Sequence, residues 1–194
     1  MEIRILEWIN TSLHGCDFIN KFIAALSSMA DKGLIWILIG LILIYFKQTR
    51  SAGFTMLIAL GTGWVLNDFI IKEIVARPRP FTESAELLQF LNTLNIGLPS
   101  SYSFPSGHSF ASLNCSVILL CFFGKKAWPA LVFGIMIALS RCFIGVHFPT
   151  DVLVGSILGV GFALFSYFVG YKIVWKKIYK WWNNKTIEKN KVSN

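Results

Sequence analysis

The chain has 194 residues, of which 55% are hydrophobic and only 14% are charged, and its mean hydropathy is +0.60. This composition excludes an ordinary soluble domain and predicts an integral membrane protein, with residues 1–194 forming a single domain. The formal net charge of +8 could suggest nucleic acid binding, but the Lys and Arg residues lie beside apolar segments; membrane topology explains them better, and we expect no nucleic acid partner.

The N-terminal segment, residues 1–30, is predicted to be amphipathic. Phe18, Phe22, Leu26 and Met29 recur at helical spacing after Asp17, a suitable N-cap. This segment either lies in the membrane interface or inserts as an extra helix.

Five apolar segments follow that are long enough to cross the hydrocarbon of a bilayer. They cover residues 33–47, 51–71, 108–124, 127–145 and 150–171. Between the second and third lies a long loop, in which Leu87, Leu91 and Leu94 predict a short interfacial helix over residues 84–95. That helix either covers the bundle or gates a lipid tail. The predicted fold is therefore an all-α, polytopic transmembrane bundle with five to six spanning helices and short interfacial helices.

The orientation follows from the loops between these segments. Alternating spans place on one side a set of basic groups: Lys47, Arg50, Lys125, Lys126 and the tail of residues 172–194, where Trp175, Trp181 and Trp182 are interleaved among lysines. The positive-inside rule makes that side cytoplasmic in a multi-pass protein of the cell membrane. The long loop and the segment around His147 then face outward. The positive-inside rule does not explain the cations on that side, whereas phosphate binding does.

The first chemical cluster runs from Lys72 to Pro80 and contains two Arg-Pro pairs, at Arg77 and Arg79. Proline ends the preceding helix and holds these cations at the membrane edge. Lysine offers a compact charge and arginine a planar fork, and both suit phosphate oxygens. The alternative is that these lysine and arginine side chains snorkel, extending their charged ends from the end of a helix into the membrane interface. Asp68, four residues before Lys72, is expected to pair with that lysine.

The second cluster is Pro105-Ser106-Gly107-His108, directly before an apolar run. A helix that starts here aims the free backbone N–H groups of Ser106, Gly107 and His108 at an anion. Ser106 adds a hydroxyl donor, and a protonated His108 could protonate a departing alkoxide. Taken alone, the cluster also fits a Ser N-cap beside an interfacial histidine.

The third cluster joins two spans and contains Arg141, His147, Pro149 and Asp151. Pro149 suits the first turn of the new helix, which leaves His147 just before it and Asp151 within it. The carboxylate can then accept a hydrogen bond from one ring nitrogen of His147, leaving the other nitrogen electron-rich and nucleophilic. Arg141 adds positive charge for the phosphoryl oxygens.

Together, Lys72-x6-Arg79-Pro80, Pro105-Ser106-Gly107-His108 and Ser140-Arg141-x5-His147-x3-Asp151 resemble the three-part signature of the type 2 phosphatidic acid phosphatase family, which is related in fold to vanadium haloperoxidases. The resemblance covers roughly residues 30–171. It implies that His147 attacks phosphorus to form a phosphohistidine, that Asp151 orients it, and that His108 protonates the leaving group. Lys72, Arg79, Arg141, Ser106 and Gly107 would hold the phosphate.

The resemblance implies no metal and no cofactor, and the sequence offers no carboxylate cluster for Mg²⁺ and no His/Cys set for Zn²⁺. We interpret the four cysteines, Cys16, Cys115, Cys121 and Cys142, as small apolar side chains. The expected partners are a lipid phosphate substrate and membrane lipids.

Three functions remain open at this point. The leading one is hydrolysis of a lipid phosphate or diphosphate, with undecaprenyl diphosphate as the favoured substrate and phosphatidylglycerophosphate or phosphatidate as the alternative. The same phosphohistidine would allow transfer to another lipid acceptor. A catalytically silent lipid-binding protein is the non-enzymatic reading, and the retention of His108, His147 and Asp151 together argues against it.

Overall fold

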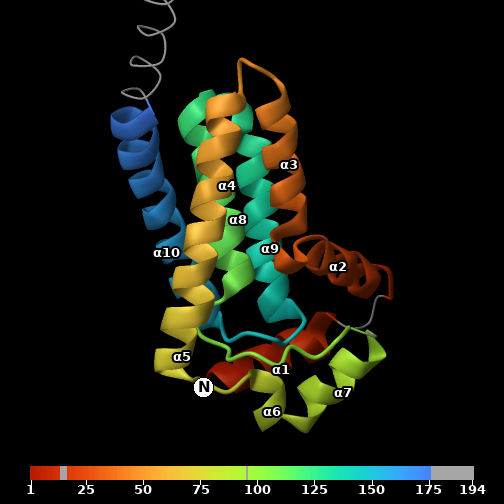
Figure 1. Cartoon of the computed structure of the whole chain (residues 1–194). Coiled ribbons are helices and arrows are strands. Elements are labelled where there is room, and N and C mark those ends of the chain that lie inside the picture. The colour runs from red at the N-terminus through yellow and green to blue at the C-terminus, as the bar shows by residue number, and fades with distance from the viewer. Residues whose placement is uncertain (14–16, 95, 176–194) are drawn as a thin grey trace, which may run out of the picture.

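The structure, a computed structural model, describes residues 1–13, 17–94 and 96–175, and over these ranges it contains helices and no strand. Figure 1 shows helices α3 (Leu34–Tyr45), α4 (Arg50–Trp64), α8 (Gly107–Phe123), α9 (Trp128–Phe143) and α10 (Pro149–Phe165) side by side as a bundle. The other α-helices of the described residues are α1 (Glu2–Leu13), α2 (Asp17–Met29), α5 (Lys72–Val75), α6 (Pro80–Glu83) and α7 (Ala85–Thr93). Most of the predicted basic tail, from residue 176 onward, and Cys16 lie outside the described residues.

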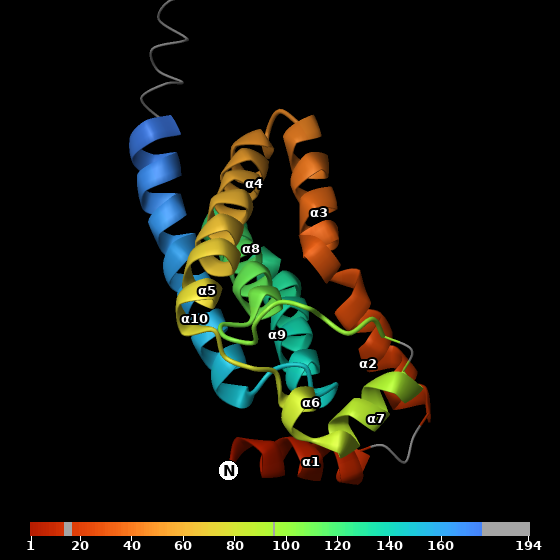
Figure 2. The ribbon, with the colours of Figure 1, turned by 60° about the horizontal axis from the view of Figure 1, so that its bottom comes forward.

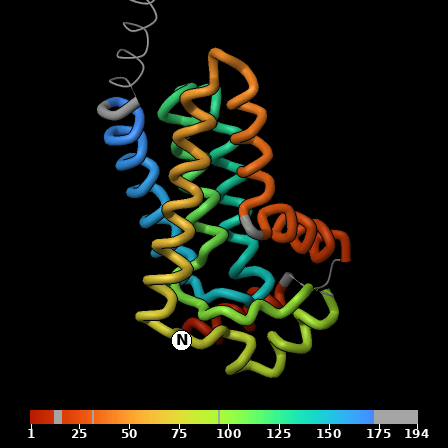
Figure 3. Tube along the Cα trace, viewed as in Figure 1, coloured from red at the N-terminus to blue at the C-terminus, as the bar shows by residue number. Residues whose placement is uncertain are grey.

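Two helices continue beyond their α-helical parts as wider π-helical segments. Residues Val65–Ile71 join α4 to α5, and residues Ser166–Trp175 follow α10. The path of the chain in Figure 3 therefore shows α4 and α5 as one long helix that reaches the end of the bundle where α1, α6 and α7 lie. This helix ends at Ala76, whose backbone is left-handed with φ 47°.

Three helical runs in the described part of the chain are long and apolar enough to cross a membrane: Arg50–Glu83, Gly107–Phe143 and Pro149–Lys172. A fourth is obtained if α2 and α3 form one span, broken by a bend of 53°. The all-helical membrane fold is thus confirmed, whereas the predicted number of five to six spans is not. The lower count arises because α8 and α9 fall within a single run, and because α3 has only 12 residues.

The N-terminal segment forms two helices, α1 and α2, and not one. The predicted stripe on α2 is only partly buried, since Leu26 is covered whereas Phe18 and Phe22 are exposed. A short turn then leads to Gly33, whose φ of 71° is readily adopted by glycine and lets the chain turn into α3. Figure 2 shows α1 crossing the end of the bundle beside α6 and α7.

Helix α8 occupies the centre of the bundle, between α4, α9 and α10. Two of its buried polar side chains are bonded to neighbouring helices: Trp36 Nε1 donates to Ser112 Oγ at 3.1 Å, and Asn114 Nδ2 donates to the carbonyl of Ala59 at 3.2 Å. Large apolar side chains on the outer surface are exposed, among them Leu38, Ile58, Leu139, Leu153 and Ile157. This inverted distribution is what a lipid-facing bundle requires.

Glycines bring α10 and α8 into backbone contact. A Cβ atom on Gly155 would lie 2.6 Å from the carbonyl oxygen of Ser106, and one on Gly159 would lie 2.4 Å from that of Phe110. Real side chains do not approach backbone atoms this closely, so both positions require glycine. The contact sets the spacing between the Pro105–His108 turn and the start of α10.

We therefore expect Gly159→Ala to destabilise the protein by about 1–3 kcal/mol, the usual cost of forcing an extra methyl group into a packed interface. The matched control is Gly161→Ala on the same helix, where a Cβ atom would meet nothing within 4 Å. Thermal unfolding of both variants in detergent measures the difference. Equal midpoints for the two variants would contradict the packing argument.

The short helices cover one end of the bundle through a second apolar cluster. Leu6 of α1 and Leu87 and Leu91 of α7 are fully covered there, packing with Ile144 and Val146 from the turn after α9. Ser84 caps α7, and its hydroxyl donates to Glu7 Oε1 of α1 at 2.8 Å. The predicted helix over residues 84–95 is confirmed as α7, and its packing favours the covering role.

Candidate active site

The three motif segments meet at the end of the bundle that α1, α6 and α7 cover (Figure 1). Lys72 begins α5, Arg79 precedes α6, Ser106 caps α8, and Arg141 lies in the last turn of α9. His147 lies in the connection to α10, whose first turn carries Asp151. All six of these side chains are buried, although five are charged or ionisable. Burying such groups costs free energy unless they pair with one another or bind a ligand.

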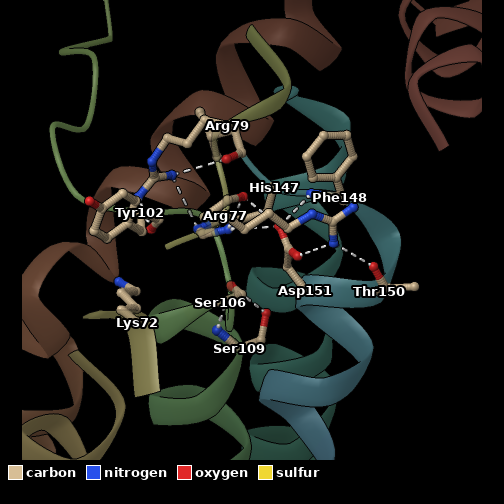
Figure 4. Close-up of polar contacts among 12 residues, drawn as sticks. Lys72, Arg77, Arg79, Tyr102, Ser106, Ser109, His147, Phe148, Thr150 and Asp151 are labelled. Atoms are coloured by element: carbon tan, nitrogen blue, oxygen red, sulfur yellow. Dashed lines mark hydrogen bonds and ion pairs between the residues drawn. The ribbon is translucent and has the colours of Figure 1, made fainter. Parts of the chain in front are cut away.

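His147 and Asp151 are brought together, but less directly than predicted. Figure 4 shows the two side chains facing each other; Nδ1 of His147 lies 3.7 Å from Oδ2 of Asp151, which is ion-pair range and not a hydrogen bond. Ser103 lies between them, donating to Asp151 Oδ2 at 2.5 Å and lying 3.4 Å from His147 Nδ1. Ser103 was missed because it belongs to none of the motifs.

The imidazole of His147 is only 2% exposed. Burial lowers the pKa of His147 to about 3, the charges of Arg79 and Arg141 act in the same direction, and Asp151 opposes them. The ring is therefore neutral at pH 7. With Nδ1 protonated toward Ser103 and Asp151, Nε2 carries the lone pair, 3.4 Å from Nη1 of Arg79.

Arg79 is fixed by backbone carbonyls. Its guanidinium donates to the carbonyl oxygens of Ser101 at 2.6 Å, Val146 at 3.0 Å and Tyr102 at 3.3 Å. A guanidinium stays charged at neutral pH. A fixed cation is therefore held beside the nitrogen that carries the lone pair.

Lys72 and Arg141 bring two further cations to the site. Lys72 Nζ pairs with Asp68 Oδ1, which confirms the predicted pair of residues four apart. Arg141 donates to Ser27 Oγ of α2, and its Nε has no hydrogen-bond partner among the described residues. A buried guanidinium with an unused donor suits an anion that approaches from the site.

The turn at Pro105–His108 differs from the prediction in one donor. The backbone N–H of Ser106 donates to the carbonyl oxygen of Asp151 at 3.0 Å, so it holds α10 and is not free for an anion. The N–H groups of Gly107 and His108 belong to the first turn of α8, which has no intrahelical partners for them. A Cβ on Gly107 would lie 3.3 Å from Asp68 Oδ2, which places this turn against the Lys72 pair.

The side chain of His108 contacts an aspartate that the sequence did not single out. Nε2 of His108 lies 2.9 Å from Oδ1 of Asp31, in the turn between α2 and α3. The charges of Arg141 and Lys72 also act on this ring, and Arg141 acts on His147 as well. Both imidazoles therefore lie within electrostatic range of the same guanidinium.

Arg77 is the other residue whose surroundings were not predicted. The sequence placed it among the cations at the membrane edge, and in the structure it forms ion pairs with Asp151 and with Glu2 of α1. Figure 4 shows its guanidinium beside Asp151, Thr150 and Phe148.

The described residues contain no group of three His, Cys, Asp or Glu side chains placed as metal ligands would be. Cys115 is buried, and Cys121 and Cys142 are half-buried free thiols. A buried thiol behaves as a small apolar side chain, in line with the role expected for these three residues.

A family model described as the PAP2 superfamily matches residues 48–175. An undecaprenyl-diphosphatase of Sulfolobus acidocaldarius is 32% identical to this chain over 135 residues, which cover 68% of this chain and 62% of that relative. This chain thus spans less than two thirds of the length of that curated relative.

Two solved structures share the fold. The crystal structure of a transmembrane PAP2 type phosphatidylglycerolphosphate phosphatase from Bacillus subtilis has a TM-score of 0.68 at 25% identity, covering 89% of this chain and 85% of that one. A bacterial vanadium-dependent iodoperoxidase has a TM-score of 0.67 at 19% identity, covering 85% of this chain and 47% of that one. At that identity, the second likeness concerns the fold alone.

Proposed function

This chain belongs to the PAP2 superfamily, and on that premise we propose that it is an integral membrane lipid phosphatase acting through a phosphohistidine. The proposal rests on the neutral, buried side chain of His147. Its Nε2 faces Arg79, and its Nδ1 faces Ser103 and Asp151. A nucleophilic imidazole needs this combination of a free lone pair, an orienting acceptor and an adjacent cation for the phosphoryl oxygens.

The reaction would proceed in two displacements. Nε2 of His147 attacks phosphorus, a P–N bond forms, and the bond to the leaving oxygen breaks as His108 donates a proton to that oxygen. Water then attacks the phosphohistidine, His108 takes the proton of that water, and the P–N bond breaks to release inorganic phosphate. Asp31 stabilises the protonated form of His108, 2.9 Å away.

The phosphate oxygens would be held by fixed positive groups. Arg79 and Arg141 supply guanidinium donors, Lys72 supplies an ammonium group, and the turn supplies the Ser106 hydroxyl and the N–H of Gly107. Ser106 Oγ accepts from Ser109 Oγ at 2.9 Å, which leaves its own proton available to donate. These charges stabilise the transferring phosphoryl group electrostatically.

The substrate class follows from where the site lies. The site lies at one end of an apolar bundle, the end that would meet the headgroups if the bundle spans a bilayer, and the relatives are named for lipid substrates. Undecaprenyl diphosphate is our first choice, supported by the archaeal relative. Phosphatidylglycerophosphate is the second, supported by the Bacillus structure, whose match covers more of both chains.

The topology proposal is five spans, α3, α4, α8, α9 and α10, within one membrane domain, with α1 in the interface. The loops that carry Lys47, Arg50, Lys125 and Lys126 lie at the end of the bundle opposite the site (Figure 1). The positive-inside rule then places those loops and the C-terminal tail in the cytoplasm and the site on the outer side.

Phosphate release from the purified protein in detergent, with EDTA present, tests the function. We expect metal-independent turnover of undecaprenyl diphosphate in preference to phosphatidylglycerophosphate and phosphatidate. Release that requires added metal would contradict the mechanism, and transfer of phosphate to a lipid acceptor would identify the transferase alternative. Binding without any release would support the silent lipid-binding protein. Hydrolysis of a short-chain, impermeant diphosphate by intact spheroplasts checks the outward placement of the site.

A further inference from the structure

The guanidinium of Arg77 donates three hydrogen bonds to protein groups at the entrance to α10. Its Nη1 donates to Asp151 Oδ1 at 2.6 Å and to Thr150 Oγ1 at 2.8 Å, and its Nη2 donates to Glu2 Oε2 at 2.6 Å. Its Cζ also lies 3.9 Å from the centre of the Phe148 ring. The planar fork is thus divided between two carboxylates and stacked on an aromatic face, a geometry that lysine cannot reproduce.

Glu2 closes this arrangement from helix α1. Its Oε1 accepts from the backbone N–H of Thr150 at 3.1 Å and from Thr150 Oγ1 at 2.8 Å. Burial alone would raise the pKa of Glu2, but hydrogen bonds from Arg77 and Thr150 hold it below its usual range. Glu2 therefore stays ionised. Its Oε1 binds Thr150 in the first turn of α10 and its Oε2 binds Arg77, so both carboxylate oxygens hold α1 to this part of the site.

These contacts determine which way the Asp151 carboxylate faces. Asp151 is 0% exposed, so its charge needs a compensating cation. Oδ1 faces Arg77, whereas Oδ2 accepts from Ser103 Oγ and from the N–H of Phe148 and lies on the His147 side. Without Arg77, Oδ1 would be a buried acceptor without its charged donor, and the carboxylate would be free to turn away from His147 or to take up a proton.

We propose that Arg77 and Glu2 are positioning residues that hold the Asp151 carboxylate toward the His147 ring, and that Arg77 does not bind the substrate phosphate. The inference rests on the proposed phosphatase function. It separates Arg77 from Arg141, whose Nε has no partner among the described residues and is available to an anion. It also makes helix α1 part of the catalytic apparatus and not only a cover.

The test compares Arg77→Gln, Arg77→Lys, Glu2→Gln and Arg141→Gln in the whole chain in detergent, measuring kcat, KM and the inhibition constant of inorganic phosphate. Glu7→Gln is the matched control, because Glu7 also ties α1 to the rest of the protein, through Ser84, but without touching Arg77. We expect Arg77→Gln to lower kcat by roughly 10- to 100-fold while the phosphate inhibition constant stays within about twofold. Arg77→Lys should restore part of kcat, Glu2→Gln should lower kcat to a smaller extent, and Glu7→Gln should match the wild-type protein.

An inhibition constant for phosphate that rises in Arg77→Gln as much as in Arg141→Gln would overturn the proposal, because it would make Arg77 a phosphate ligand. Wild-type kcat in Glu2→Gln, or equal losses in Glu2→Gln and Glu7→Gln, would remove Glu2 from the positioning role. If Arg77→Gln does not fold, Arg77→Lys and Glu2→Gln carry the test, because the first retains the charge and the second the shape of the original side chain. If the proposed phosphatase function itself is wrong, the wild-type protein will release no phosphate, and this result is distinguishable from a failure of the positioning role.

Discussion

Replacing His147 with alanine is expected to abolish phosphate release, with kcat falling roughly 10⁴-fold or more, as happens when an enzyme loses its nucleophile. Alanine leaves no nitrogen to form the P–N bond, whereas Lys72, Arg79 and Arg141 remain in place. Inorganic phosphate should therefore still bind. The measurements are phosphate release from the lipid substrate and phosphate binding by calorimetry on the same preparation.

Phosphate binding is also the control for folding, because a collapsed site would lose binding and turnover together. A second measurement follows the intermediate: brief reaction with labelled substrate should transfer label to the wild-type protein and not to His147→Ala. Turnover at the wild-type rate by the variant would rule out the phosphohistidine mechanism.

Asp151→Asn has the second largest expected effect, a loss in kcat of roughly 10³- to 10⁴-fold by analogy with the orienting aspartate of a catalytic triad. The carboxylate accepts from Arg77, Ser103 and the N–H of Phe148. An amide has only one oxygen, so its NH₂ group must face a donor or turn toward His147. An NH₂ group turned toward His147 favours the wrong tautomer of the imidazole, and both arrangements remove the negative charge that stabilises its protonated form.

The matched control for that variant is Asp17→Asn, because Asp17 also lies in the first turn of a helix but pairs with Lys21 on the surface. Its turnover should equal that of the wild-type protein. The phosphate inhibition constant of Asp151→Asn should stay near the wild-type value, since Asp151 is not expected to touch phosphate. A large rise in that constant would assign Asp151 a different role.

Sequence patterns predicted the long helices well because each is a continuous apolar run bounded by glycine, proline or charge. The start of α10 at Pro149, the stripe on α7 and the pairing of Asp68 with Lys72 follow from local spacing alone. The motif residues that gather at one end of the bundle were also identified, because spans of similar length return the chain to the same side.

The contacts that were missed join segments far apart in the chain. Glu2 and Arg77 are 75 positions apart, and His108 and Asp31 are 77 positions apart, so no local period relates them. Ser103 reaches Asp151 only because α8 and α10 touch through glycine. The Ser106 N–H was assigned to an anion for the same reason, since its partner, the carbonyl oxygen of Asp151, is visible only once the two helices pack.

The backbone contact at Gly155 divides the site into two parts with different mechanical properties. The Pro105–His108 turn and the start of α10 touch main chain to main chain, so they must move together. Helices α1, α6 and α7 are held instead by side-chain packing and by ion pairs such as Glu2 with Arg77. Breathing motions should therefore be concentrated in these short helices, and their amides should exchange hydrogen for deuterium sooner than those of α8 and α10.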